Sequence, residues 1–351
     1  MLNAQQFGDM LWQAMKNDGK TPSHDIYGNG DQAVVPEYLD SDHLIPSDDV
    51  DWVDEILRAA VVQSYNLSFT KADKKSNQLF SLGYYDQQGL VKFSDFKRVS
   101  GRFNSEYKLF DDHFRIGENI SLSHSWGTSV SNNAALGGTL YEAYKFQSIT
   151  PVKNLEDEYA GNVFSDIPNP MGKLYRNKDN QDKKSRLVGN LYAELHLFDG
   201  LMFKTSFGVD YNNLYRRSFS PKYDELNASE KLSSLSNRNA WNFNWVFTNT
   251  LTYNKTFGDH TINALLGMES LRNRYEYFTA SRDGFPSDDP NFRFLDAGDV
   301  GTQKNSGAAT EYSMVSYFGK LDYNYHDRYL VAFTLRRDGS SRLGNNKWGN
   351  F

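Results

Sequence analysis

The chain has no cysteine among its 351 residues, which excludes disulfides, thiolate metal sites and thiol nucleophiles. It also lacks long apolar runs. The longest, from Tyr329 to Phe333, falls far short of the roughly 18 to 20 residues that a membrane-spanning helix needs. Basic residues do not dominate, because 38 Lys and Arg stand against 44 Asp and Glu and form no visible stripe. Nucleic-acid binding is therefore not expected.

Recognisable catalytic chemistry is missing as well. No HExxH, GxSxG, P-loop or dinucleotide-binding motif occurs, and the seven histidines are scattered along the chain. The acidic segments "EDE" at 156–158 and "SDDP" at 287–290 could hold calcium, but they match no EF-hand spacing, and solvated loops are the favoured interpretation. We therefore expect that the protein is not an enzyme and that it has no catalytic, cofactor-binding or metal-ligating residues.

Aromatic residues, by contrast, are abundant. The 24 Phe, 22 Tyr and 6 Trp make up 15% of the chain, although its mean hydropathy is only -0.67. In "WNFNWVFTNTLTYN", residues 241–254, large apolar side chains alternate with Asn and Thr. This period of two predicts a strand with one apolar and one polar face. Asn249 is out of step on the apolar face, which suggests a local bulge or a patch covered by protein.

The same alternation recurs along the chain and predicts ten strands. They are centred on residues 65–69, 80–84, 99–109, 114–126, 187–197, 201–211, 241–254, 262–268, 315–323 and 329–335. Before them, a helix is expected to begin at the N-cap Asn3, with Gln6 three residues on, and to end near Asn17. Residues 20–50 are rich in Gly, Pro, Asp and Ser and predict an irregular loop.

The connections between these strands alternate strictly in length. The short ones are "KADKKSN", "FDDH", "FDG", "NKTFGD" and "NYHD", and the long ones span 86–95, 127–184, 212–238 and 280–309. Strands that run up and down between two dissimilar surfaces give this order, as in outer-membrane barrels with short turns on one side and long loops on the other.

A soluble antiparallel sheet also alternates apolar and polar residues, since one of its faces covers a core. Two features favour a membrane barrel instead. The polar faces carry charges in mid-strand, at Arg102, Glu106, Lys204 and Asp210. Tyrosines also flank the short turns, where an aromatic girdle would meet a membrane interface. These girdle candidates are Tyr107, Tyr253, Tyr323, Tyr325 and Tyr329.

Three segments resemble SusC/RagA-type TonB-dependent outer-membrane receptors. "SYFGKLDYNYHDRYLVAFTLRRDGSSRLG", residues 316–344, is similar to a turn and strand pair typical of that family. Its most specific part is 337–341, and Leu343 stands where Phe is expected. "DWVDEILRAAVVQSYNLSFT" with "SLGYYDQQGLVKFSDFKRVSGRFN" looks like the early barrel. "LNAQQFGDMLWQA" looks like the helix between the plug and those strands.

The resemblance implies an all-β fold: an antiparallel up-and-down transmembrane β-barrel, here partial, with about ten strands of a larger barrel and a short N-terminal helix. Such receptors carry a signal sequence, a TonB box and a plug before this region and further strands after it, up to 22 in all. Residues 1–58 would be the helix and loop preceding the strands, and 59–351 the partial barrel with long extracellular loops at 127–184, 212–238 and 280–309.

The implied function is TonB-dependent uptake of a large nutrient, an oligosaccharide or peptide, across the bacterial outer membrane. A SusD-like surface lipoprotein and the TonB complex would be the partners, beside outer-membrane lipid. Two alternatives stay open: a complete small outer-membrane barrel acting as a passive pore or adhesin, and a soluble secreted carbohydrate-binding β-protein.

Candidate ligand contacts are the tyrosines of the loop 127–184, because aromatic faces beside polar groups suit ligands that are partly apolar. The alternative is that the aromatic rings of this loop pack it against itself or against neighbouring segments. The four candidates are Tyr141, Tyr144, Tyr159 and Tyr175.

Overall fold

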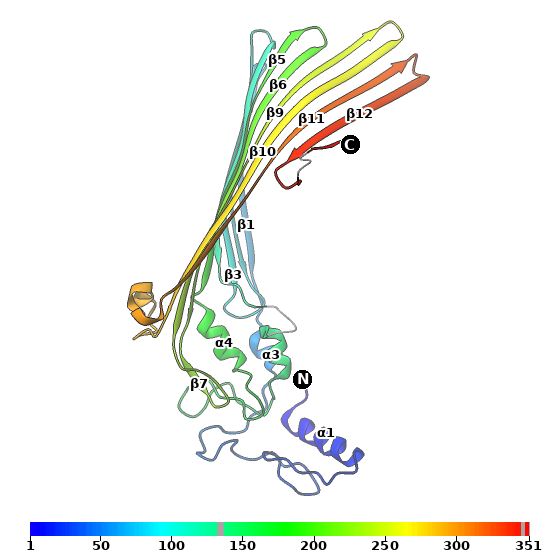
Figure 1. The fold of residues 1–351 in the computed structure, drawn as a ribbon. Helices are drawn as coiled ribbons and strands as arrows, with labels where there is room; N and C mark the ends of the chain where they lie inside the picture. The colour runs from blue at the N-terminus through cyan, green and yellow to red at the C-terminus, as the bar shows by residue number, and fades with distance from the viewer. Residues whose placement is uncertain (132–136, 345–347, 351) are drawn as a thin grey trace.

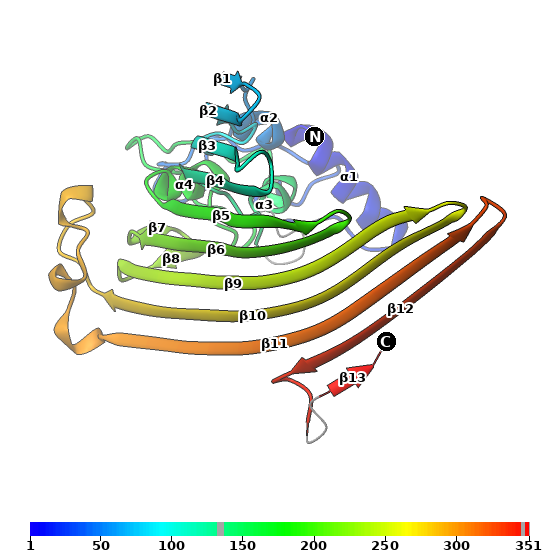
Figure 2. The ribbon, with the colours of Figure 1, turned by 90° about the horizontal axis from the view of Figure 1, so that it is seen from above.

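A computed structural model describes residues 1–131, 137–344 and 348–350. One antiparallel sheet contains eleven of its strands, and they lie side by side in chain order (Figures 1 and 2). These strands are β1 Val62–Ala72, β2 Ser76–Gln88, β3 Asp95–Leu109, β4 Phe114–Gly127, β5 Gln181–Phe198, β6 Leu201–Ser220, β9 Ser234–Phe257, β10 His260–Asp283, β11 Lys304–Tyr325, β12 Tyr329–Ser340 and β13 Trp348–Asn350. The ten predicted strands are confirmed, and β13 is additional.

The sheet is curved and open. Within the described residues β1 pairs only with β2, and β13 only with β12, so the first and last strands do not meet. Figure 2 shows the strands following one another around a bend from β1 to β13. An open antiparallel sheet of this kind fits part of a larger barrel, as expected.

The connections keep the predicted order of short and long. The short turns are 73–75, 110–113, 199–200, 258–259 and 326–328, and all lie at one end of the sheet, which we call the short-turn end. The opposite, long-loop end carries 89–94, 128–180, 221–233 and 284–303. Two of these loops are shorter than the expected 212–238 and 280–309, because β6, β9, β10 and β11 extend further than the alternation indicated.

Helices and a small hairpin lie at the long-loop end (Figure 1). Helix α1, Ala4–Asn17, is confirmed, and Asn3 and Gln6 form the expected capping box. Three short helices and a second two-stranded sheet were not expected: α2 Trp52–Ile56, α3 Thr139–Lys145, α4 Pro170–Asn177, and β7 Tyr223–Glu225 paired with β8 Ala228–Glu230. Three single 3-10 turns, η1 Pro290–Phe292, η2 Leu295–Ala297 and η3 Val300–Thr302, follow β10.

No helix in the described part of the chain is long and apolar enough to cross a membrane.

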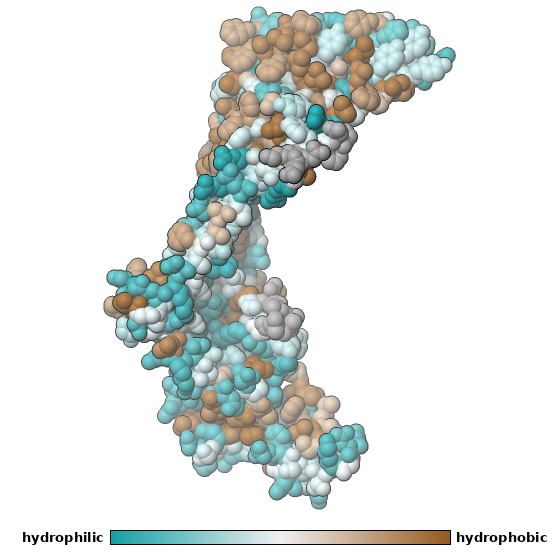
Figure 3. All heavy atoms as spheres, in the orientation of Figure 1, coloured by the Kyte–Doolittle hydropathy of each residue, from teal (hydrophilic) through white to brown (hydrophobic). Residues whose placement is uncertain are grey.

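One face of the sheet, the apolar face, exposes large hydrophobic side chains. Phe207 pairs with Phe247, and both rings are exposed, Phe247 to 39%. Figure 3 shows hydrophobic residues gathered at the short-turn end and hydrophilic ones beyond them. Asn249 lies on this face between Thr205 and Met268 in unbroken register, so the suggested bulge is wrong. The described register shift in the sheet lies elsewhere, between His196 and Phe198.

The opposite, polar face carries the charges that the sequence placed in mid-strand. Lys204 pairs with Glu194 at 2.8 Å, and Asp210 pairs with Arg186 at 2.8 Å. The Thr248 hydroxyl donates a hydrogen bond to Glu269 at 3.2 Å. Charges that are paired across strands in this way are typical of a face that meets water.

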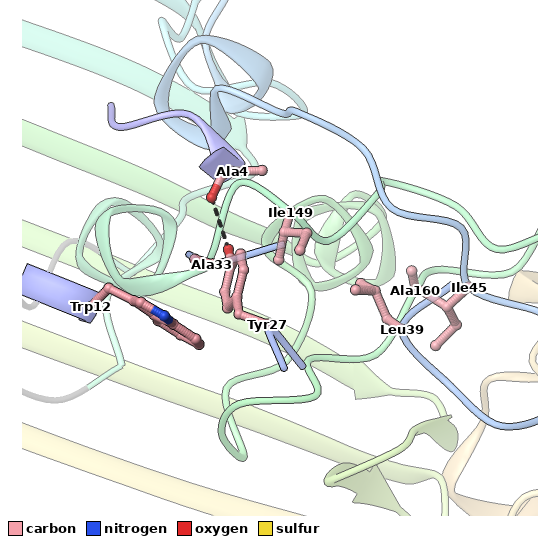
Figure 4. Packing of buried hydrophobic residues seen from close by; sticks show 8 residues of the cluster. All are labelled: Ala4, Trp12, Tyr27, Ala33, Leu39, Ile45, Ile149 and Ala160. Atoms are coloured by element: carbon pink, nitrogen blue, oxygen red, sulfur yellow. Dashed lines mark hydrogen bonds between the residues drawn. The ribbon is translucent and has the colours of Figure 1, made fainter. Parts of the chain in front are cut away.

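The long loops contain a core of their own. Residues 20–50 lack regular structure, as expected, yet they wrap α1 and meet the loop 128–180 (Figure 4). The Tyr27 hydroxyl donates to the Ala4 carbonyl at 3.0 Å, and Trp12 donates to the Gly30 carbonyl at 2.9 Å. The buried members of this cluster are Ala4, Trp12, Tyr27, Ala33, Leu39, Ile45, Ile149 and Ala160.

A second cluster ties the loop 128–180 to the segment before β1. Trp52 is fully buried and meets the Phe146 ring edge-on, with ring centroids 4.6 Å apart. Ile56, Met171 and Leu174 complete the contact. The long-loop end is therefore packed around apolar clusters of its own.

Candidate ligand-binding site in the long loops

The structure brings together two of the four candidate tyrosines. The rings of Tyr159 and Tyr175 lie 5.9 Å apart, and both line a cleft of about 700 Å³ at the long-loop end. Tyr141 is elsewhere, on α3, with the Lys145 ammonium 4.5 Å from its ring. Tyr144, on the same helix, is 66% exposed and does not line the cleft.

Helix α4 positions Tyr175, and Asn169 fixes the start of that helix. The Asn169 side-chain oxygen accepts hydrogen bonds from the Met171 and Gly172 N–H groups at 3.0 and 3.1 Å. Its amide nitrogen donates to the carbonyls of Val152 and Ala160. Asn169 is fully buried, so one side chain both caps the helix and fixes the strand-like segment that leads to Tyr159.

The β7–β8 hairpin closes one side of the cleft through a buried carboxylate. Glu225 pairs with Arg176 at 2.6 Å and accepts the Asn169 N–H at 2.7 Å. Burial raises the pKa of Glu225 above its ordinary value, while Arg176 and the Asn169 N–H act in the opposite direction. Gly161 and Gly172 make room for it, since a Cβ on either would lie under 3 Å from Glu225.

Each tyrosine of the cleft has a cation over its ring. Lys153 lies 4.5 Å from the Tyr159 centroid, Lys178 lies 3.6 Å from that of Tyr175, and Arg176 lies 3.9 Å from that of Tyr223. Such contacts orient both the ring and the charge. Burial raises the pKa of Tyr159 and of Tyr223 above the ordinary value of a phenol.

A third loop completes the cleft with Arg293. Its guanidinium lies 3.3 Å from Asp179 and 4.5 Å from the Phe219 ring centroid, and it donates to the Asp288 carbonyl. Phe219 belongs to a small core with Leu235 and Phe285. The cleft therefore joins side chains from the loops 128–180, 221–233 and 284–303.

Sequence reasoning missed Arg176, Tyr223 and Arg293. None of them stands in a motif, and only the folding of three loops against one another brings them together. The rings of Phe146 and Phe164 from the same loop do pack inside the protein, at Trp52 and at Phe7 and Tyr27, as the packing alternative anticipated.

Metal-binding chemistry does not emerge from the described residues, where no group of three His, Asp or Glu side chains is arranged to hold an ion. In the segment 287–290, Asp289 accepts the Asn291 N–H and caps η1. Asp157 of the segment 156–158 pairs with Lys153 at 3.3 Å.

Comparison with known proteins gives relatives that match over part of their length. No family model matches the chain. TonB-dependent receptors P3 and P39 of Formosa agariphila are 31% and 26% identical to it, each over 86% of the chain and over 30% and 28% of the receptors. TonB-dependent receptor SusC of Bacteroides thetaiotaomicron is 26% identical over 93% of the chain and 34% of that receptor. The chain thus spans about a third of the curated relatives it matches.

Solved structures share the fold. The alignment with the RagAB peptide transporter covers 96% of this chain and 38% of the transporter chain, with a TM-score of 0.77 and 24% sequence identity. The structure of the RagAB peptide importer in the closed-closed state covers 100% of this chain and 39% of its own chain, with a TM-score of 0.76 and 23% sequence identity.

The sheet therefore defines part of a β-barrel of the TonB-dependent receptor class. Within that class the chain is of the SusC/RagA type, as its motifs indicated.

Proposed function

We propose that this chain forms part of the barrel of an outer-membrane transporter that takes up a large nutrient with energy from TonB. The short turns face the periplasm in this proposal, and the long loops face the outside. The observation that carries it is the pairing of an exposed apolar face with a charged polar face over the same strands.

The apolar face supports this placement because aromatic side chains bound it at both ends. Tyr325 and Tyr329 stack at the short-turn end, with centroids 6.4 Å apart. Towards the long-loop end, Trp245 pairs with Arg272, beyond which charges appear on this face. On β9, the stretch from Trp245 to Tyr253 matches the 9 to 11 residues with which a strand crosses a bilayer.

We propose that the cleft at Tyr159 and Tyr175 contacts the nutrient, and that a peptide suits it better than an oligosaccharide. One face of each ring is taken by the chain's own cation, which leaves fewer faces for sugar stacking. The lining also mixes Arg293 and Lys178 with Asp157 and Asp288, which suits a ligand carrying both signs of charge. The RagAB structures are those of a peptide transporter.

Calorimetry on the full-length receptor tests this proposal. Tyr175→Ala should weaken binding of a transported peptide about tenfold, the effect of roughly 1.4 kcal/mol. Tyr144→Ala is the matched control, because that ring is on the same loop but outside the cleft. Equal peptide affinity of the two variants would reject the cleft as the ligand-binding site. Tighter binding of an oligosaccharide than of any peptide would reverse the ligand class.

The proposal includes a SusD-like lipoprotein at the long-loop end and dependence on TonB. Uptake that stops in cells lacking TonB supports active transport. Uptake that continues there would favour the passive pore. Recovery of the protein in a soluble fraction without detergent would favour the secreted carbohydrate-binding protein.

A further inference from the structure

A groove of about 780 Å³ runs along the apolar face between β10, β11 and β12. Register places Leu266, Gly319 and Leu335 in one line across the three strands. Gly319 has no side chain, so this line is notched in the middle. A Cβ atom at position 319 would lie 3.2 Å from the Leu266 Cδ2 atom, so any larger side chain there would fill the notch. We call this the Gly319 groove.

The walls of the Gly319 groove are apolar and exposed. Leu321 and Phe333 pair with each other on one side of the notch, towards the short-turn end, and Phe333 is 61% exposed. Tyr317 lies on the other side. A hydrocarbon chain that lay over Gly319 would touch Leu266, Phe333 and Leu335 at once and would fill space that packed side chains leave open.

A cation marks one end of the groove. Arg337, exposed on the apolar face, pairs with Tyr317, and its guanidinium lies 5.0 Å from the Trp348 ring centroid. Tyr317 and Trp348 stack with centroids 6.1 Å apart. No carboxylate of the described residues pairs with Arg337. Its neighbour Arg336 points to the polar face and pairs with Asp338 at 2.9 Å.

The charge of Arg337 thus lies beside an apolar groove, and none of the carboxylates in the described part of the chain balances it. A charged group at a hydrocarbon face is costly unless it reaches an anion or water at the membrane surface. Arg337 lies towards the long-loop end of the groove, and the apolar walls continue from it towards the Tyr325 and Tyr329 girdle. A ligand with a polar head and an apolar tail could therefore place its head at Arg337 and its tail along the apolar walls of the groove.

We propose that the Gly319 groove binds an acyl lipid with a phosphate headgroup, its phosphate on Arg337 and one chain over Gly319. Guanidinium groups bind phosphate through two parallel hydrogen bonds, and aromatic rings such as Trp348 suit the boundary between headgroup and hydrocarbon. This proposal rests on the membrane placement proposed above. It does not depend on the transported nutrient or on the cleft in the long loops.

Native mass spectrometry of the detergent-solubilised full-length receptor tests the groove, with phosphatidylglycerol as the probe. Diacylglycerol with the same chains is the phosphate-free comparison. Wild-type protein should retain phosphatidylglycerol and release diacylglycerol. Arg337→Gln should lower phosphatidylglycerol affinity about tenfold, and Gly319→Leu should do the same by filling the notch.

Two variants on the same face serve as controls. Arg272→Gln removes a cation that is already paired with Glu311 at 2.7 Å. Gly189→Leu adds a side chain to an outward-facing glycine where a Cβ meets neighbours only at 3.7 Å or more. Both should retain the lipid as the wild type does.

Equal retention in all four variants would overturn the proposal, and so would equal retention of the two lipids by wild-type protein. Failure of the wild-type protein to retain phosphatidylglycerol at all would also overturn it. Location in the outer membrane is scored separately by cell fractionation, so failure of the membrane placement is distinguishable from failure of the groove.

Discussion

Arg176 and Glu225 form a 2.6 Å ion pair that joins two loops 49 positions apart in the sequence. The Glu225 side chain is 2% exposed, so water contributes little to its solvation. The pair fixes the β7–β8 hairpin against α4 and thereby shapes the cleft that contains Tyr159 and Tyr175.

Removing the cation should loosen the hairpin strongly. Arg176→Ala leaves a buried carboxylate without its partner, which costs about 3 to 5 kcal/mol in comparable sites. Cleavage by trypsin at Lys222 and the exposed Lys231 should accelerate accordingly. The double variant Arg176→Ala with Glu225→Gln should cleave more slowly than Arg176→Ala alone. If the single variant resists trypsin as the wild type does, the ion pair does not hold the hairpin.

The same carboxyl group should make the loops more stable in acid. The folded state holds the Glu225 proton more tightly than the unfolded chain, whose carboxyl titrates near 4.5. The contribution of Glu225 to stability is therefore fully present below about pH 4.5 and is lost as the pH rises through the raised pKa. Hydrogen exchange at the Met171 and Gly172 amides, corrected for the intrinsic rate, measures this trend.

Glu142 contributes in the same direction, since burial raises its pKa beside Lys173. Glu225→Gln should therefore reduce the pH dependence at those two amides, and adding Glu142→Gln should reduce it further. A pH trend that is unchanged in Glu225→Gln would assign it to other groups.

The two faces of β9 should respond differently to a new charge. Phe247→Arg puts a cation on the apolar face and should cost about 2 kcal/mol in a bilayer, while Thr248→Arg on the polar face should cost far less. A urea titration of the full-length protein in lipid vesicles gives both values. Equal costs would mean that the faces are assigned wrongly.

The short turns should differ in their tolerance of a side chain. Gly200 has a φ of 88°, and a Cβ there would lie 2.5 Å from the Asn254 carbonyl oxygen. Gly200→Ala should therefore cost about 3 kcal/mol. Gly258, with a φ of 57° and nothing within 4 Å, should lose only about 1 kcal/mol as Gly258→Ala. Refolding midpoints in urea compare the two, and equal shifts would contradict the steric argument.

The strands were predictable where one face is apolar and the other polar, because only that contrast between the two faces gives the sequence a period of two. Beyond the apolar band both faces meet polar surroundings. Asn212 and Asn213 continue β6 without alternation, as do Arg216 and Arg217, and the strand runs on to Ser220. The early part of β9, which begins at Ser234, was missed for the same reason.

The long loops were less predictable. Helix α1 carries a local capping signal and was found, whereas α2, with only five residues, has too few positions to show a period. Tyr159 and Tyr175 were chosen by residue type alone. Their cleft also depends on Glu225 and Arg293, which reach it through contacts across more than 45 sequence positions.

Strands β9 and β10 each run for 24 residues, more than twice what a bilayer crossing requires. From Trp245 back to Ser234, β9 continues for roughly 36 Å at about 3.3 Å per residue. This stretch is hydrogen-bonded to β6 and β10 on its two sides, so it extends the sheet as a continuous, ordered structure beyond the apolar band. In the proposed membrane placement, this extension of the sheet holds the long loops away from the lipid headgroups, and a ligand would reach the cleft on the outer side of them.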